Sequence, residues 1–561
     1  MTLDKLVFVD KVMDSVYGYI DVTKVEREII ALPIFKRLHM IKQLSLVDFV
    51  FPSAVHTRFS HSLGVMYMAD AMAVQLGLGI CERQKLRLAA LLHDIGHYPL
   101  AHVGEKAYLL LSKVKPVSGG PLSLSSLTDP LYFENALFEL HYSEQEKELR
   151  KLISPTAKDI KASLFGKTGN STSWHHETVG AKIINENPDI LRVVQECLCD
   201  EKRIVFSGTP SQCDIKVFLE GISNIVKGSY VSPEDYVLVQ LLHSELDADR
   251  LDYMKRDSIH IGTNFGADLG TLIKNLEKRD VSVTPCRKPL PVVGIKEKGV
   301  AAADQFLINR FFNNRHILGN RHILALEFMA FAIIVCAYLD PFPNGFPKSE
   351  AELTEMVSER SNNCSLLGFT DLLFWKVVRE YSVTDRSDIP GIVKSFSKYL
   401  SKYQEVSSSV PHANKVDILT DLHITLRSLS DLPNYRSYKT AVRKFSNKRC
   451  HRPIEKFQDV RIVSLSRQKP FKNYLDIAER KYHGSSSTTS SVMEKCRLVA
   501  ESFENRLLES IVVFGKEEEG GACFSSPRLL IDCKQSLIHS LSSLKSVEIT
   551  EFNILFHDKE D

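Results

Sequence analysis

Helical periodicity is the feature that most restricts what this chain can fold into. Apolar residues recur mostly at steps of three and four along residues 26–44, 62–76 and 83–92. This spacing places the apolar side chains on one face of a helix, so each segment is predicted to be helical. Strand-like runs are few, and residues 460–465 and 508–514 are the best candidates. The sequence therefore predicts a mainly α protein.

Length and turn-rich segments indicate how the chain is divided. Its 561 residues exceed the length of one ordinary domain. Residues 117–130, 166–173 and 484–491 contain SGGPLSLSS, GKTGNSTS and GSSSTTSS, and are expected to be loops. We expect a helical core over residues 1–275, a helical second unit over 276–430 that completes the site, and a mixed α/β region over 431–561.

Charge and hydropathy bear on location and partners. The chain has 71 Lys and Arg against 69 Asp and Glu, so its formal net charge of +2 creates no strong overall field. We expect no secretion signal, because the first residues mix charged and apolar side chains. The most apolar run, residues 323–339, contains Glu327 and is shorter than the roughly 20 residues of a membrane span. We therefore expect a buried helix there, no membrane contact and a cytoplasmic protein.

Four residues have the side chains of a metal site. His61, the adjacent pair His93 and Asp94, and Asp249 each lie beside a helical pattern. Two imidazoles and two carboxylates suit one divalent transition metal (Fe, Mn, Ni, Co or Zn), with additional Mg also compatible. Neighbouring residues lie about 100° apart on a helix, so His93 and Asp94 can share one ion only at a helix end. Gly96 supplies such a break.

Each ligand alone has a simpler explanation, because a His-Asp dipeptide is common by chance. The surroundings make chance less convincing, since His97 and His102 follow within ten residues. Packing at a helix end remains an alternative for His97, and a surface position an alternative for His56.

Ordered motifs around these residues resemble one known family. The motifs are HTRFSHSLG (56–64), LLHDIGHYPLAH (91–102), WHHE (174–177) and DADRLDYMKRD (247–257), and the similarity extends over residues 9–339. They resemble the HD-superfamily dNTP triphosphohydrolases, including the vertebrate SAM- and HD-domain enzyme and bacterial dGTPase-like relatives. The resemblance implies an HD-domain helical core and metal-dependent hydrolysis of a dNTP to deoxynucleoside and triphosphate. No SAM domain is expected before the HD unit.

The resemblance also implies roles for individual residues. It makes His61, His93, Asp94 and Asp249 the metal ligands, His102 and Glu105 a catalytic pair, and His176 the acid that protonates the leaving group. The implied substrate contacts are Arg58 at the α-phosphate, Arg250, Tyr253 and Arg310 toward the phosphates, Gln43 and Asp257 at the sugar 3′-hydroxyl, and Leu44 at the 2′ position. Three alternatives stay open: a surface role for Arg310, a core position for Tyr253 and a helix cap for Glu177.

The sequence also departs from the family. Ala31, Lys36 and His39 occupy the positions of the vertebrate guanine-reading activator residues, and Leu318 replaces a tyrosine that packs on the sugar. An insert over roughly residues 108–170 separates His102 from His176. It could cover or reshape the site.

Partners and rival functions follow from the remaining features. Basic and aromatic residues alternate from Arg436 to Lys456, which suits either a solvated helix face or a nucleotide or nucleic-acid contact. A homo-oligomer, dimer or tetramer, is expected. The rivals to a dNTP triphosphohydrolase are an HD phosphodiesterase or phosphatase acting on another nucleotide or nucleic acid, and a binding scaffold whose HD site is only structural.

Overall fold

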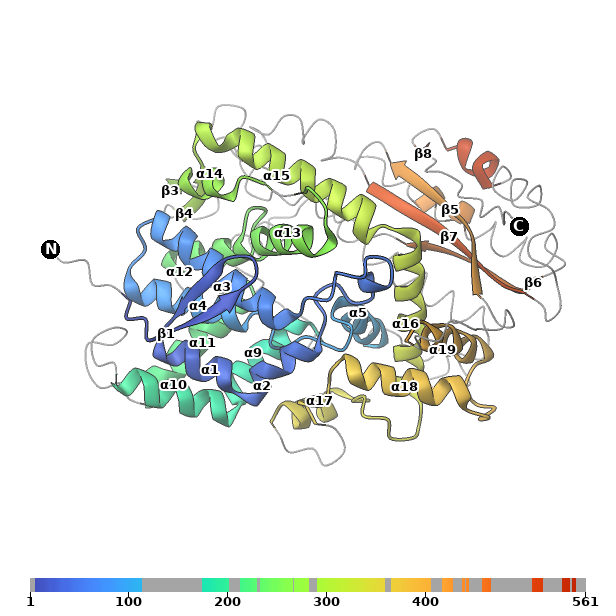
Figure 1. Ribbon diagram of the computed structural model, residues 1–561, viewed down its shortest axis with the longest axis horizontal. Helices are drawn as coiled ribbons and strands as arrows, with labels where there is room; N and C mark the ends of the chain where they lie inside the picture. The colour runs from blue at the N-terminus through green and yellow to red at the C-terminus, as the bar shows by residue number, and fades with distance from the viewer. Residues whose placement is uncertain are drawn as a thin grey trace.

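Helices dominate the described part of the chain, as predicted (Figure 1). The computed structural model describes residues 6–112, 174–200, 212–229, 233–265, 267–281, 290–358, 365–404, 416–426, 436–438, 440–442, 457–465, 507–517, 537–544 and 547–550. The three predicted loops, all but the first residues of the predicted insert and most of the basic run lie outside these residues.

The first part of the chain is a helical bundle. Its elements are α1 (Lys24–Ala31), α2 (Pro33–Lys36), η1 (Arg37–Met40), η2 (Val47–Phe49), α3 (Arg58–Gln75), α4 (Ile80–Leu92), α5 (His102–Leu111), α9 (His176–Glu186), α10 (Pro188–Asp200), α11 (Gln212–Val226), α12 (Pro233–Leu242), α13 (Ala248–Ile261) and α14 (Leu269–Lys274). Helix α3 packs against both α4 and α13, while α11 packs against α4 and α9. The central position of α3 brings three separate stretches of sequence to one place.

The helical pattern predicted over residues 26–44 is divided among several elements and ends at Met40. The chain instead forms α1, α2 and the 3-10 turn η1, with Leu32 in an extended conformation between the first two. Pro33 follows Leu32, and a proline disfavours helical geometry in the preceding residue while suiting the first position of a new helix. The apolar spacing was detected correctly, but the proline divides it between separate elements.

The second part of the chain continues the same core. It contains η3 (Glu297–Gly299), α15 (Val300–Asn313), the π turn η4 (Asn314–Leu318), α16 (Arg321–Leu339), α17 (Glu350–Val357), α18 (Asp371–Val383) and α19 (Gly391–Gln404). Among the described helices, α16 has the length and apolar composition of a membrane span, yet 78% of its window from His322 to Leu339 is buried within the protein. It packs against α5, α18 and α19. A buried helix was predicted for this segment.

The described strands form two hairpins and one larger sheet. Strand β1 (Asp10–Asp14) pairs antiparallel with β2 (Gly18–Val22), and β3 (Leu276–Val281) with β4 (Leu290–Ile295). Strands β5 (Val416–Leu426), β6 (Phe457–Leu465), β7 (Leu507–Glu517) and β8 (Val547–Thr550) form an antiparallel sheet in the order β6-β7-β5-β8. Strands β6 and β7 contain the two predicted strand segments, and the sheet confirms a strand-containing C-terminal region.

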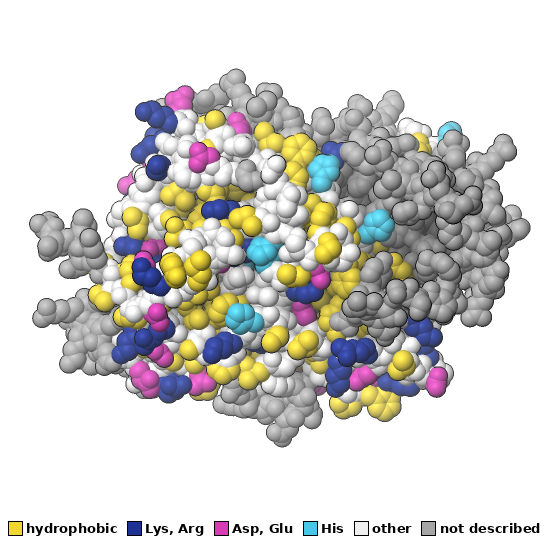
Figure 2. Space-filling model, viewed as in Figure 1, with side chains coloured by type: hydrophobic (Ala, Val, Ile, Leu, Met, Phe, Trp, Pro, Cys, Tyr) yellow, Lys and Arg dark blue, Asp and Glu magenta, His cyan; other side chains and the backbone are white. Residues whose placement is uncertain are grey.

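One apolar core extends through both helical parts. Buried side chains from Ile20 to Leu400 belong to a single contiguous cluster. The core therefore has no break near residue 275, and the division of the chain at that point stays a prediction. On the face in Figure 2, described Lys and Arg side chains lie among Asp and Glu, which agrees with the near-zero net charge.

Candidate active site

Three helices bring the four predicted metal ligands together. His61 lies in the first turns of α3, His93 caps the C-terminus of α4 with Asp94 directly after it, and Asp249 lies in the first turn of α13. Because α4 ends at this point, His93 and Asp94 can both turn toward α3. Gly96 allows a close approach, since a Cβ atom there would lie 2.2 Å from the carbonyl oxygen of His176.

The ligand atoms lie within a few ångströms of one another. Nε2 of His61 is 3.0 Å from Oδ1 of Asp249 and 3.7 Å from Oδ2 of Asp94. Nε2 of His93 is 3.3 Å from Oδ1 of Asp94 and 3.9 Å from Oδ1 of Asp249. His61, Asp94 and His93 are buried, whereas the Asp249 side chain is 36% exposed and forms the open side of the site.

The two imidazoles are oriented as metal ligands usually are. Nδ1 of His61 lies 2.7 Å from Oδ2 of Asp252, and Nδ1 of His93 lies 2.7 Å from the carbonyl oxygen of Ala90. In both rings the buried Nε2 atom has no hydrogen-bond partner. A second group that holds Nδ1 and leaves Nε2 for the ion is typical of metal-binding histidines. These orphaned nitrogens, beside two carboxylates, fit a divalent metal.

A buried charge network supports His61, and the sequence prediction did not include it. Both Asp252 oxygens accept hydrogen bonds from Arg256, which also donates to Asp14 of β1 at 2.8 Å. Burial favours the neutral form of Asp252, but Arg256 outweighs it and lowers the pKa of the carboxyl. Gly64 makes room for this network, because its Cβ would lie 1.9 Å from Asp252. The i, i+3 spacing of Asp249 and Asp252 was the available sequence signal.

Arg58 lies directly beside the metal ligands. Its Nη1 donates to Oδ2 of Asp94 at 2.7 Å, and its Nη2 donates to the Gln43 carbonyl at 3.4 Å. Burial acts to raise the pKa of Asp94, but the Arg58 guanidinium and the imidazole of His93 lower it well below the usual range. Asp94 is therefore ionised, as a metal ligand must be.

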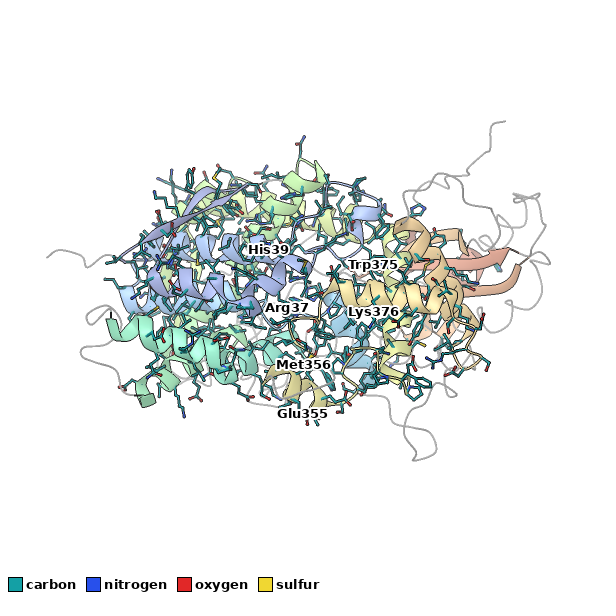
Figure 3. All side chains as sticks on the ribbon, turned by 60° about the horizontal axis from the view of Figure 1, so that its bottom comes forward. Arg37, His39, Glu355, Met356, Trp375 and Lys376 are labelled. Atoms are coloured by element: carbon teal, nitrogen blue, oxygen red, sulfur yellow. The ribbon has the colours of Figure 1, made fainter. Side chains whose placement is uncertain are left out.

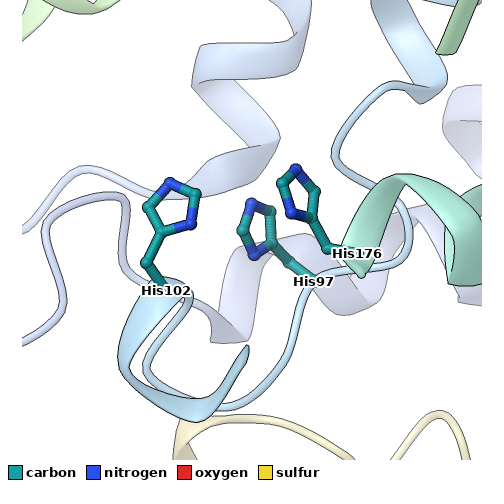
Figure 4. A group of neighbouring side chains, drawn as sticks. All are labelled: His97, His102 and His176. Atoms are coloured by element: carbon teal, nitrogen blue, oxygen red, sulfur yellow. The ribbon is translucent and has the colours of Figure 1, made fainter. Parts of the chain in front are cut away.

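A second cluster lies next to the metal site. Glu105 accepts from His102 Nδ1 at 3.0 Å and from His176 Nδ1 at 2.8 Å, so one carboxylate joins both predicted catalytic histidines. The His97 ring stacks on His176 at 4.0 Å between centroids (Figure 4). Nε2 of His97 lies 3.1 Å from Oδ1 of Asp94. His97 therefore connects the two clusters, which is more than packing at a helix end.

The three histidines of Figure 4 do not form a second metal site of the ordinary kind. Their nitrogens are close together, but the rings of His97 and His176 are only 15° from parallel. An imidazole binds a metal near its own plane at about 2.1 Å, so two stacked rings cannot share one ion.

His176 is protonated near neutral pH. Burial lowers its pKa, but the carboxylates of Glu105 and Glu177 outweigh burial and raise the pKa to about 9. Because Nδ1 is held by Glu105, the proton available for transfer is on Nε2. Glu177 therefore acts electrostatically on His176, and its side chain lies 3.6 Å from Nδ1 of that ring.

The candidate sugar contacts lie near an isolated antiparallel bridge between Lys42 and Thr57. Gln43 is buried, and its Oε1 has no hydrogen-bond partner. Asp257 lies 2.7 Å from Nε2 of His56, and His56 is buried, so the alternative of a surface position for His56 is wrong. Leu44 and Leu318 pack against the same small apolar cluster, in agreement with the family resemblance, which implied a place near the sugar for both.

Both arginines among the candidate outer-phosphate contacts pair with acidic side chains. Arg250 pairs with Asp247, and Arg310 donates to Glu245 at 2.5 Å. The Arg310 side chain is only 11% exposed, so its expected surface role is wrong. Tyr253 packs partly buried against the main core, close enough for the charges of both arginines to affect its pKa, which burial raises overall.

Comparison with known protein families identifies the domain around these residues. The HD domain family matches residues 58–205. An uncharacterized protein from Mycoplasma pneumoniae, the MG461 homolog, is 25% identical over 329 residues, which cover 58% of this chain and 59% of that protein.

Two named relatives and one solved structure add to this. The deoxynucleoside triphosphate triphosphohydrolase SAMHD1 from Gallus gallus is 29% identical over 268 residues, covering 46% of this chain and 35% of that protein. The Homo sapiens protein of that name is 40% identical over 107 residues, covering 18% and 17%. A hypothetical protein from Aquifex aeolicus shares the fold with a TM-score of 0.51 at 20% identity, covering 96% of this chain and all of that one. This chain thus spans less than two thirds of the length of its curated relatives.

Proposed function

We propose that this chain, which belongs to the HD superfamily of phosphohydrolases, hydrolyses deoxynucleoside triphosphates to deoxynucleoside and triphosphate. The observation that carries the proposal is the pair of buried Nε2 atoms on His61 and His93, which face Asp94 and Asp249 without hydrogen bonds. The mixed nitrogen and oxygen donors suit Fe, Mn, Ni, Co or Zn. When bound, such an ion would act as a Lewis acid on phosphate oxygens and activate water.

The protein's own residues supply the other chemical requirements. Arg58, held beside Asp94, presents a positive charge where the α-phosphate would lie and can donate charge-assisted hydrogen bonds to it. His176 carries a proton on Nε2 that can pass to the departing O5′ oxygen as the bond to the α-phosphorus breaks. Glu105 orients both His176 and His102 by accepting from their Nδ1 atoms.

Discrimination for the deoxy sugar would come from the groups near Gln43. Its buried Oε1 lacks a partner and could accept a hydrogen bond from a sugar 3′-hydroxyl, together with the carboxylate of Asp257. Leu44 presents an apolar side chain for the 2′ position. A 2′-hydroxyl left without a partner there would cost roughly 1–3 kcal/mol, or about 10- to 100-fold in rate.

The test is a panel of dNTPs and NTPs incubated with metal-loaded protein, with inorganic triphosphate and nucleoside measured as products. We expect triphosphate release from dNTPs and at least about 10-fold slower release from the matching NTPs. Asp94→Ala should lose both bound metal and turnover while circular dichroism stays helical, because Asp94 belongs to the ligand set.

Three results would contradict the proposal. Release of monophosphate or orthophosphate instead of triphosphate would favour the phosphodiesterase or phosphatase alternative. Equal rates on dGTP and GTP would remove the sugar assignment. Full turnover by metal-free Asp94→Ala would remove the site assignment itself.

A further inference from the structure

The turn that leads into His102 has an unusual backbone. Leu100 and Ala101 have φ values of +55° and +52°, and His102 is the first residue of α5 directly after them. Residues with a Cβ rarely adopt this region, and they remain there only when their surroundings hold them. The position of the His102 imidazole therefore depends on whatever holds the turn.

One carboxylate from the second part of the chain holds it. Asp371 is the first residue of α18, and its Oδ1 accepts the N–H of Leu100 at 2.7 Å. Its Oδ2 accepts the N–H of Lys42 at 2.9 Å, next to Gln43. Asp371 is 6% exposed, so no water can easily replace these bonds. Both oxygens thus bind backbone N–H groups within two residues of a predicted site residue, Gln43 on one side and His102 on the other.

A buried arginine joins the same two parts. Arg37 donates to the carbonyl oxygens of Ile95 at 2.6 Å, of His97 at 3.0 Å and of Phe369 at 2.8 Å. It thereby ties the segment after Asp94 to the segment before Asp371. Figure 3 shows Arg37 at the end of α2, on the side that faces Trp375 and Lys376 of α18. The loop before α18 and the first residue of α18 therefore support the catalytic segment at two points, Phe369 through Arg37 and Asp371 directly.

We propose that Asp371 is a positioning residue for the reaction: it fixes the turn at Leu100 and Ala101 and so sets His102 against Glu105 and His176. Both Asp371 oxygens are engaged by backbone N–H groups, so we assign the residue a positioning role and not a catalytic one. The expected effect on kcat rests on the proposed function. The structural role of Asp371 in holding the turn does not.

The kinetic test is a double-mutant cycle with Asp371→Asn, His102→Ala and both together, assayed for triphosphate release. The asparagine NH₂ cannot accept, so one of the two backbone N–H groups loses its partner. Misplacing a catalytic group should lower kcat by about 10- to 100-fold in the wild-type background, with KM changed less than about 3-fold. In the His102→Ala background, the same substitution should cost less than about 2-fold, because the residue it positions is absent.

Controls separate positioning from general damage. Asp268→Asn is matched, because Asp268 also accepts a backbone N–H, from Thr271 at the exposed start of α14, and should leave kcat unchanged. Asp371→Glu keeps the charge but moves it by one methylene, so it should show the same dependence on His102 if Asp371→Asn does not fold. Equal losses of kcat in both backgrounds, or no loss in either, would overturn the proposal.

A second readout does not require turnover. Hydrogen exchange of the peptide covering residues 98–105 should be at least about 10-fold faster in Asp371→Asn than in the wild type, and unchanged in Asp268→Asn. Unchanged exchange would overturn the proposal even if kcat fell. If the wild type hydrolyses no dNTP, the proposed function fails, while the exchange rates still decide whether Asp371 holds the turn.

Discussion

Replacing Asp252 with asparagine should weaken metal binding although Asp252 is not a ligand. The carboxylate is fully buried, and its Oδ2 lies 2.7 Å from Nδ1 of His61 and 2.9 Å from Nε of Arg256. An amide at this position removes the negative charge that orients the His61 ring. It also removes the charge that makes the Nε2 atom of His61 a more basic metal ligand. Losing such a supporting partner typically costs 10- to 100-fold in metal affinity, or about 1.4–2.7 kcal/mol.

The assay is a titration of metal-free protein with Mn²⁺ or Zn²⁺ against a competing chelator. Asp70→Asn is the matched control, because Asp70 of α3 also pairs with a buried arginine, Arg87 of α4, but lies nine residues from His61, about 13 Å along the helix. We expect Kd to rise only in Asp252→Asn. An unchanged Kd there, or an equal rise in Asp70→Asn, would refute the view that Asp252 acts through His61.

Three further outcomes follow from the geometry. Gly64→Ala should lower the free energy of unfolding in urea by about 1–3 kcal/mol, because its methyl would lie 1.9 Å from a buried carboxylate oxygen, whereas Gly391→Ala, with open space around it, should stay within about 0.5 kcal/mol. kcat/KM should fall as pH rises through about 9, because His176, whose pKa is raised to about 9, is protonated below that pH and loses the transferable proton above it. A pH profile of His176→Gln that kept this fall would contradict the assignment of His176 as the acid. GTP should not activate turnover through a vertebrate-type site, because the Ala31 side chain has no acceptor for the guanine edge and the His39 ring is stacked on Phe59, with ring centroids 3.6 Å apart. Strong activation of the wild type by GTP would contradict this prediction.

The sequence was most informative where chemistry and helical spacing coincide. His61, His93, Asp94 and Asp249 could be selected because each has a metal-binding side chain beside a helical pattern, and the fold brings them together. Helices α3 and α4 begin three or four residues before their predicted starts, since caps rather than apolar spacing determine where a helix begins. Pro33 is the residue in this segment that marks the break, because it starts a new helix and leaves Leu32 extended.

What could not be predicted depends on contacts between distant residues. Nothing near Asp14 in the sequence indicates that it meets Arg256, and nothing near Asp371 indicates that it meets Leu100. Such pairs become visible only when the fold places the partners together. Similarly, an arginine such as Arg310 is usually found at a protein surface, and its buried pairing with Glu245 arises only once the fold brings the two side chains together.

Because α16 is buried against other helices, the loss of activity on heating is expected to accompany global unfolding. Helix α16 packs against α5, and α5 begins at His102. Loss of α16 would expose the apolar side of α5 to water and release the end of the helix that presents the imidazole. Heat inactivation should therefore coincide with the loss of helical signal in the melting curve, rather than precede it as it does when an active site sits on an independently opening lid.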